Sequence, residues 1–172
     1  MLTSLETLFS KPDNRIEQDI PWKVSEFETS KGTFPVAKAS ELHLELLHTD
    51  KRRLKVDGSI DITFNIPCDR CLEDVPVSFP IQFHKEIDCN HLDTEDNSDD
   101  TQYIVDNALD TDKIIRDELL LEWPAKILCR EDCKGICRVC GHNLNVSDCG
   151  CDRVVLDPRM AAIQDIFKNA NK

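Results

Sequence analysis

Cysteine is the residue type with the clearest capacity for chemistry in this chain. Nine cysteines occur in 172 residues, and six of them stand close together near the C-terminus: Cys129, Cys133, Cys137, Cys140, Cys149 and Cys151. Two thiolates separated by two residues can bind one metal ion, as in Cys137-Arg-Val-Cys140, and Gly141 then allows the tight chain reversal that follows such a pair. The sequence therefore predicts a cysteine-bound metal ion, most simply zinc in a structural role.

A closed structural zinc site takes four donors, so the six cysteines offer more thiols than one ion needs. The spacing favours one ligand from each side of the central pair, giving the set Cys133, Cys137, Cys140 and either Cys149 or Cys151. Cys129 is explained equally well as a ligand and as a small buried hydrophobic residue. We expect about one zinc ion per chain.

A second cysteine pair, Cys68-Asp-Arg-Cys71, has the same spacing but lies far from the others in sequence. Two thiols alone cannot close a site. Three interpretations are open: the pair joins the C-terminal cysteines in space, it binds a separate ion, or it packs at a turn with Arg70 pointing outward.

The cysteine pairs are joined to segments that are predicted to be mainly strands. Apolar residues alternate with polar ones over three segments, which is the period that buries one face of a strand. The segments are 42–46, 54–66 and 75–83. Together they predict an antiparallel β-meander. Pro76 and Pro80 lack the N–H that a central strand needs, so the third segment is expected at a sheet edge or with a bulge.

One helix and two further segments complete the predicted fold, which is α+β. Thr111 or Asp112 can cap a central helix that carries Ile114, Ile115 and Leu119 inward and is stopped by Pro124, after a short strand at 103–105. Asp157-Pro158 predicts a short C-terminal helix. We expect three parts: an N-terminal segment 1–34, a sheet and helix domain 35–125 with an acidic disordered loop near 89–100, and a zinc-binding cysteine-rich segment with the C-terminal helix, 126–172.

Charge and composition limit the partners and the location. The 33 Asp and Glu residues exceed the 21 Lys and Arg residues, which gives a formal charge of −12 and works against extended contact with nucleic-acid phosphates. An odd number of cysteines and a start without the pattern of a secretory signal favour a reducing compartment, the cytoplasm. No apolar run approaches the ~20 residues that cross a bilayer, so we expect no membrane partner.

The linked motifs resemble the YceD family, bacterial and plastid proteins linked to accumulation of large-subunit ribosomal RNA. The resemblance lies in Cys68-Asp-Arg-Cys71-Leu72 and in a run that contains Trp123-Pro124, Cys133-Lys-Gly135, Cys140-Gly141, Asn143-Leu144-Asn145 and Asp157-Pro158-Arg159. It implies a role in ribosome biogenesis. We expect a non-catalytic factor that promotes accumulation or maturation of large-subunit ribosomal RNA by binding ribosomal protein or RNA.

An acidic chain is better suited to hold a basic ribosomal protein than to coat RNA. Direct RNA contact is then confined to small sites, for which the candidates are Lys51, Arg52, Arg53, Lys55, Arg70, Lys134 and Arg138. Two other classes of function stay open. A metal-dependent RNA-processing enzyme is disfavoured because surplus thiolates would fill every coordination position. A thiol or metal sensor would use Cys68 and Cys71 as reactive thiols. No small-molecule substrate is evident.

Overall fold

The computed structural model describes residues 2–5, 8–9, 14–49, 53–89 and 101–152. The chain divides into two compact units. The sheet unit comprises Met1–Pro67 and Asp74–Ile127, and the cysteine unit comprises Cys68–Glu73 and Leu128–Lys172. The expected acidic loop near 89–100 falls, apart from Cys89, outside the described residues, as do the expected C-terminal helix and both Lys51 and Arg52.

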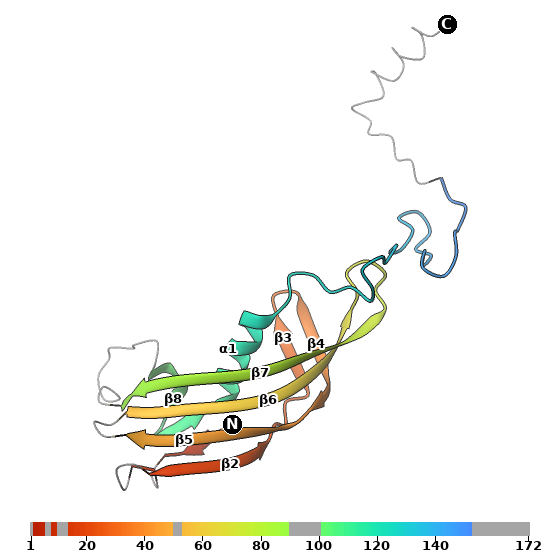
Figure 1. Ribbon diagram of the computed structural model, residues 1–172. Coiled ribbons are helices and arrows are strands. Elements are labelled where there is room, and N and C mark those ends of the chain that lie inside the picture. Colours follow the sequence, from red (N-terminus) through yellow and green to blue (C-terminus); the bar gives the residue numbers. More distant parts are fainter. Residues whose placement is uncertain (1, 6–7, 10–13, 50–52, 90–100, 153–172) are drawn as a thin grey trace, which may run out of the picture. The chain divides into compact units, whose positions relative to one another are not determined.

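A six-stranded antiparallel sheet dominates the sheet unit (Figure 1). Its strands are β2 (Arg15–Pro21), β3 (Glu26–Thr29), β4 (Gly32–Ala39), β5 (Glu41–Thr49), β6 (Arg53–Pro67) and β7 (Asp74–Asp88). The order is β2-β5-β6-β4-β3, and β7 pairs with β6. Two of these strands, β2 and β3, and the first three residues of β4 come from the segment 1–34. This part of the chain therefore belongs to the sheet.

The sheet is more elaborate than the simple meander expected from the sequence. Strands β5, β6 and β7 pair in succession, but β4 also pairs with β6, beyond the point where β5 stops. The reason lies at Ser40, between β4 and β5. Its N–H donates to Asp61 O (2.9 Å), and its Oγ accepts from Asp61 N (3.0 Å), so the chain continues along the same edge of β6 instead of reversing.

Strand β7 lies at the edge of the sheet, as its two prolines predict. It pairs with β6 over its full length, and among the described strands it has no second partner. Pro76 and Pro80 stand opposite Asn65 and Asp61 in a continuous register without a bulge. Because no further strand pairs with β7 among the described strands, the missing N–H groups of the two prolines leave no second ladder incomplete.

The helix α1 (Thr111–Glu122) follows a small sheet of β1 (Leu2–Ser4), β9 (Ala108–Asp110) and β8 (Ile104–Val105). The expected strand at 103–105 forms only over its last two residues, because Tyr103 ends a 3-10 turn, Thr101–Tyr103. Asp110 rather than Thr111 or Asp112 caps the helix: its carboxylate accepts from Lys113 N (3.3 Å). The helix stops before Pro124, as predicted.

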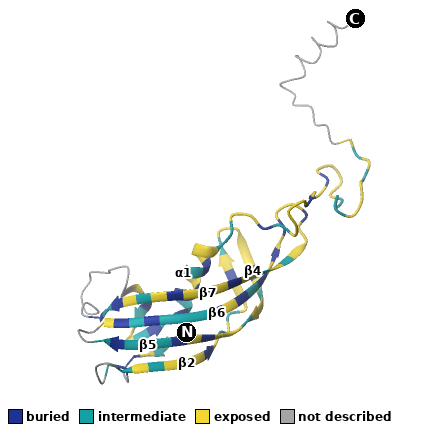
Figure 2. Ribbon diagram, viewed as in Figure 1, coloured by how far each residue is buried: buried dark blue, intermediate teal, exposed yellow. Residues whose placement is uncertain are grey.

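One hydrophobic core joins the inner face of the six-stranded sheet to α1 and β9 (Figure 2). Alternate residues of β6 are buried, and Ile114, Ile115 and Leu119 of α1 are fully buried, as the sequence predicts. Trp123 stacks against Phe27 and Phe79 at centroid distances of 5.5 and 5.1 Å. Every member of this core lies in the sheet unit. No helix within the described residues is long and apolar enough to span a membrane.

Candidate metal centres

Eight of the nine cysteines gather into two groups of four, both within the cysteine unit. The first centre consists of Cys68, Cys71, Cys129 and Cys133, and the second centre consists of Cys137, Cys140, Cys149 and Cys151. The four Sγ atoms of each group lie within 4.8 Å of one another. The ninth, Cys89, is buried in the sheet unit.

The spacing of the sulfur atoms suits a metal ion and not a disulfide. In the first centre, Sγ of Cys71 lies 3.6 Å from Sγ of Cys129, and Sγ of Cys68 lies 3.9 Å from Sγ of Cys133. Four sulfurs held about 2.3 Å from a tetrahedral zinc ion are about 3.8 Å apart. A disulfide would bring two of them to about 2.05 Å. All nine cysteines are free thiols, so the donors fit a thiolate-bound ion such as zinc.

Each centre is built on the same local turn. Leu72 N donates to Cys68 O (3.0 Å) and Gly141 N donates to Cys137 O (2.8 Å), so each Cys-x-x-Cys pair is closed by a bond across four residues. The residue after the pair has a left-handed backbone, with φ of 64° at Leu72 and 75° at Gly141. These turns direct backbone N–H groups toward sulfur, as at Val139 N, which donates to Cys137 Sγ (3.4 Å).

The thiols of each centre differ strongly in pKa. At Cys137, the N–H groups of Cys140 and Val139 lower the pKa to about 6, against the opposing effect of burial. Burial would raise the pKa of Cys68, but N–H groups from Cys71, Arg70 and Cys129 outweigh it and lower the pKa to about 6. Burial would likewise raise the pKa of Cys133 in the first centre, but hydrogen bonds, chiefly from the Asn145 amide and the Gly135 N–H, outweigh it and lower the pKa. Each centre therefore contains at least one thiol that is prepared as a thiolate, the form that binds metal.

The opposite shift occurs at the partner thiols. The N–H of Glu73 favours ionisation of Cys71, but burial and the sulfurs of the other three first-centre cysteines outweigh it and raise the pKa to about 12. Hydrogen bonding with Cys140 and Cys149, together with burial, raises the pKa of Cys151 to about 12. Four thiolates at this distance repel one another, and a bound divalent cation would remove that conflict.

The two centres differ in exposure. Cys68, Cys71 and Cys133 are buried in the first centre, whereas Cys137 alone is buried in the second. Both centres offer four thiols and thus fill a tetrahedral coordination shell. Catalytic zinc keeps one position open for water or substrate, so this donor set suits a structural role.

The grouping differs from the ligand set that the sequence favours. Cys133 lies with Cys68, Cys71 and Cys129 instead of with Cys137, and both Cys149 and Cys151 complete the second centre. The cause is the segment between Cys133 and Cys137. Ile136 N donates to Arg70 O (3.1 Å), and Gly135 lies so close to the backbone of Arg70 that a Cβ there would be 3.0 Å from the carbonyl oxygen. Of the interpretations open for Cys68 and Cys71, the structure supports their joining the C-terminal cysteines.

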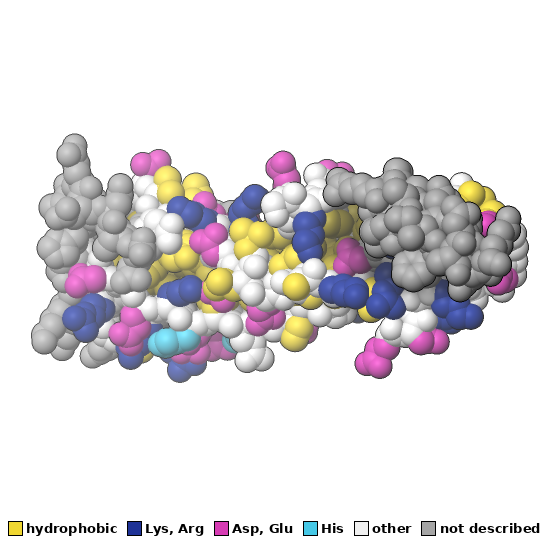
Figure 3. Space-filling model, turned by 90° about the horizontal axis from the view of Figure 1, so that it is seen from above, with side chains coloured by type: hydrophobic (Ala, Val, Ile, Leu, Met, Phe, Trp, Pro, Cys, Tyr) yellow, Lys and Arg dark blue, Asp and Glu magenta, His cyan; other side chains and the backbone are white. Residues whose placement is uncertain are grey.

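The candidate RNA-contact residues fall into different surroundings. The Arg70 guanidinium donates to Cys133 O (2.7 Å) and Glu131 O (3.3 Å), so it holds the first centre together. Lys55 forms an ion pair with Glu86 (3.0 Å), and Arg53 is exposed. Lys134 and Arg138 are exposed on the cysteine unit. On the face seen in Figure 3, Lys and Arg side chains lie singly or in small groups among carboxylates.

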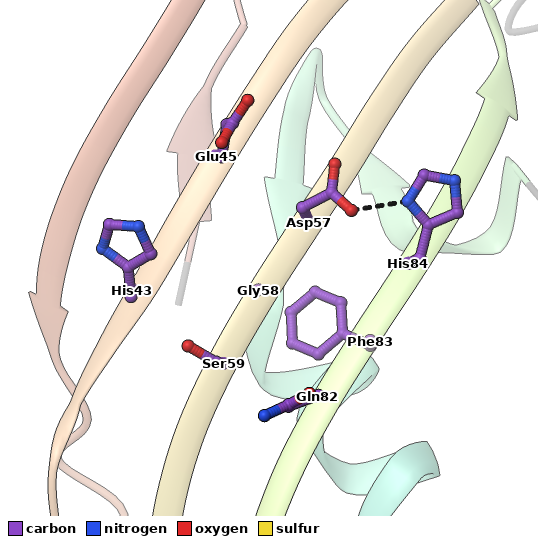
Figure 4. Close-up of a pocket in the computed structure, with 8 residues that line it drawn as sticks. All are labelled: His43, Glu45, Asp57, Gly58, Ser59, Gln82, Phe83 and His84. Atoms are coloured by element: carbon purple, nitrogen blue, oxygen red, sulfur yellow. Dashed lines mark hydrogen bonds and ion pairs between the residues drawn. The ribbon is translucent and has the colours of Figure 1, made fainter.

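The outer face of the sheet carries a depression that no sequence pattern indicates. It has a volume of about 460 Å³ and is lined by residues of β5, β6 and β7: His43, Glu45, Asp57, Gly58, Ser59, Gln82, Phe83 and His84 (Figure 4). His84 Nδ1 lies 2.5 Å from Asp57 Oδ1, and His43 Nδ1 lies 2.8 Å from Asp19 Oδ1. Strand pairing also aligns Glu17, Glu45 and Asp57 in one row across the sheet. No local spacing signals this row, since each residue comes from a different strand.

Comparison with known proteins places this architecture in a family. A family described as "Large ribosomal RNA subunit accumulation protein YceD" matches residues 56–167. The uncharacterized protein YlbN of Bacillus subtilis (strain 168) is 31% identical over 156 residues, covering 80% of this chain and 90% of YlbN.

Plant proteins are also similar. The chloroplastic large ribosomal RNA subunit accumulation protein YCED homolog 1 of Zea mays is 29% identical over 129 residues, covering 58% of this chain and 44% of the maize protein. Its Arabidopsis thaliana counterpart is 28% identical over 131 residues, covering 60% and 41%. The match thus spans less than half the length of the plant proteins. No solved structure is significantly similar. The match across most of the chain, which includes the cysteines of both centres, shows that the chain belongs to the YceD family.

Proposed function

We propose that this protein is a non-catalytic factor in ribosome biogenesis, which promotes accumulation or maturation of large-subunit ribosomal RNA by binding a basic ribosomal protein or the RNA itself. The observation that carries the proposal is the pair of closed four-thiol centres in a member of the YceD family. Such centres shape a binding module and offer no open coordination position for an enzymatic reaction. Free thiols in this number suit a reducing compartment, the cytoplasm.

Zinc is the proposed ion at both centres. Four thiolates from Cys68, Cys71, Cys129 and Cys133 would hold one ion, and four from Cys137, Cys140, Cys149 and Cys151 would hold the other. Zinc bound in this way cross-links segments that are distant in sequence. The cysteine unit needs such cross-links, because cysteines are most of its buried side chains among the described residues.

Charge favours a basic protein as the direct partner. The chain carries a formal charge of −12, and the outer sheet face presents the row of Glu17, Glu45 and Asp57, whose charge is offset in part by the ion pair of Arg15 with Glu45 (2.8 Å). Such a field attracts Lys and Arg side chains and speeds their association. Any RNA contact is more local. Lys134 is the best placed residue for it, because it is exposed and lines a hollow of about 410 Å³ with Asn145 and Ser147.

A pull-down from growing cells, with and without nuclease, tests the proposal. Retention of ribosomal protein after nuclease treatment identifies a protein partner, and loss of all ribosomal material identifies RNA. A variant carrying Glu17→Gln, Glu45→Gln and Asp57→Asn should recover less ribosomal protein and show a flatter salt dependence.

The matched control places two neutral substitutions, Glu131→Gln and Asp132→Asn, on exposed carboxylates of the cysteine unit. It should behave as the parent does if the sheet face makes the contact. Recovery of neither ribosomal protein nor ribosomal RNA by the parent chain contradicts the proposed function.

A further inference from the structure

The loop between two ligands of the second centre contacts the first centre. Cys140 and Cys149 border this loop, and Asn145 lies near its middle. The Asn145 amide Nδ2 donates to Cys133 Sγ (3.3 Å), and its Oδ1 accepts from Lys134 N (2.8 Å). In the same loop, Asn143 Nδ2 donates to Glu73 Oε1 (2.9 Å), and Glu73 follows the first cysteine pair. Ligands of one centre thus delimit the loop that supports a ligand of the other.

Backbone pairing holds the loop against the segment that joins the two centres. Leu144 N donates to Gly135 O (2.9 Å), and Cys137 N donates to His142 O (2.8 Å). Between these bonds, Ile136 and Asn143 form an isolated antiparallel bridge. Asn143 Oδ1 also accepts from Asn145 N (2.9 Å), which orients the Asn145 backbone. The position of the Asn145 amide therefore depends on the ordering of the whole loop.

We propose that the two centres bind their metal ions cooperatively, and that Asn145 is the positioning residue that carries the coupling. When Cys140 and Cys149 coordinate the same ion, the two ends of the loop are held together. The entropic cost of ordering the loop is then smaller. The ordered loop holds the Asn145 N–H on Cys133, where a hydrogen bond stabilises the thiolate that binds the first ion. By linkage, occupancy of the first centre favours the second to the same extent.

The inference rests on the metal binding proposed above, and Co²⁺ titration of the full chain measures it. Metal is first removed from the reduced protein, and Co²⁺ is then added in competition with a chelator of known affinity. Three proteins are compared: the parent, a variant lacking the second centre (Cys140→Ser with Cys149→Ser) and a variant lacking the first (Cys71→Ser with Cys129→Ser). We expect the overall binding constant of the parent to exceed the product of the two single-centre constants by about 5- to 150-fold.

Asn145→Ala provides the second, decisive measurement, because it keeps all eight thiols. Removal of a group that supports a metal ligand typically weakens metal binding about 10- to 100-fold, and we expect the overall constant of Asn145→Ala to fall by that factor. The ratio of this overall constant to the product of the two single-centre constants should fall toward one. Ser147→Ala is the matched control: the Ser147 Oγ lies 2.8 Å from His142 Nε2 in the same loop, so its loss removes a hydrogen bond that involves neither centre.

The possible outcomes distinguish the existence of the metal centres from the coupling between them. A parent chain that binds no Co²⁺ contradicts the metal centres of the proposed function. Two ions bound with a ratio near one, or a parent-like overall constant in Asn145→Ala, overturns the coupling while leaving the centres intact. An equal loss in Ser147→Ala and Asn145→Ala also overturns it, because the effect would then belong to the loop in general and not to the amide on Cys133.

Discussion

Leu72 and Gly141 occupy the same position in two equivalent cysteine turns, and both have a left-handed backbone. Each follows the second cysteine of its pair and donates its N–H to the carbonyl of the first. The φ angles are 64° at Leu72 and 75° at Gly141. Glycine adopts this conformation without a Cβ clash, whereas leucine is strained there. The first centre is thus built with strain that the second avoids.

Leu72→Gly should therefore tighten metal binding at the first centre. The left-handed backbone costs a residue such as leucine about 1–2 kcal/mol, of which the greater freedom of unfolded glycine offsets about half, leaving a gain of roughly 0.5–1 kcal/mol. Little burial is lost because the Leu72 side chain is 64% exposed. The Co²⁺ affinity of the first centre, measured in the variant that lacks the second centre, checks this prediction.

Gly141→Leu should weaken metal binding at the second centre, and Gly141→Asn should weaken it less, since asparagine tolerates this backbone. Weaker binding by Leu72→Gly would refute the strain.

Elemental analysis should find two zinc ions per chain in protein prepared with zinc under reducing conditions. The two groups of four thiols replace the single ion expected from the sequence. Cys137→Ser should leave at most one ion. A parent chain that never exceeds one ion per chain would exclude one of the centres.

Removal of the metal should loosen the cysteine unit and leave the sheet unit folded. The reason is that the large hydrophobic core consists only of residues from the sheet unit. Hydrogen exchange after chelation should lose protection at residues 128–152 and keep it in β5, β6 and β7. Loss of protection throughout the sheet would show that the two units do not fold separately.

Gly58→Ala should destabilise the sheet unit. A Cβ at this position would lie 2.2 Å from the nearest ring atom of Phe83, which faces Gly58 in the paired strand. Overpacking of this kind typically costs about 1–3 kcal/mol. Urea unfolding followed by far-UV circular dichroism measures the change. Ser59→Ala, one residue along the strand on the opposite face, is the control and should change stability little. Combination with Phe83→Leu should cost less than the sum of the two single changes.

The pKa of His43 should lie above its ordinary value of 6.5, chiefly because of the hydrogen bond to Asp19, with smaller contributions from the charges of Asp19, Glu17 and Glu45. A raised pKa means that the contribution of this pair to stability is present below pH 6.5 and is lost as the pH rises through the pKa of the folded protein. The effect on folding should be small, since the His43 side chain is 47% exposed.

Titration of the imidazole by NMR measures this pKa directly. Asp19→Asn should lower it toward 6.5, while Asp61→Asn, on the same sheet face but outside the pairs that involve His43, should leave it unchanged. An equal pKa in the parent and in Asp19→Asn would contradict the assignment.

The main elements of the sheet unit are predictable from the sequence, because their signals are local. Alternating burial along β6 follows from alternating residue types, and the prolines of β7 require an edge position wherever that strand pairs. The inward face of α1 and its stop before Pro124 are equally local. The helix is capped by Asp110 and not by Thr111 or Asp112, because Asp110 ends β9 and its carboxylate lies at the first turn of the helix.

The division of the cysteines into two groups of four depends on tertiary contacts. Spacing along the chain groups Cys133 with Cys137, but Cys133 lies instead against Cys68, 65 residues away in sequence, and Cys129 against Cys71, 58 residues away. These distances depend on contacts between segments that are far apart in sequence, and no local pattern encodes them. The same holds for Asn145 on Cys133, and for the row of Glu17, Glu45 and Asp57 from three strands. A metal centre depends on where four side chains meet in space, and that is settled by the packing of the segments between them.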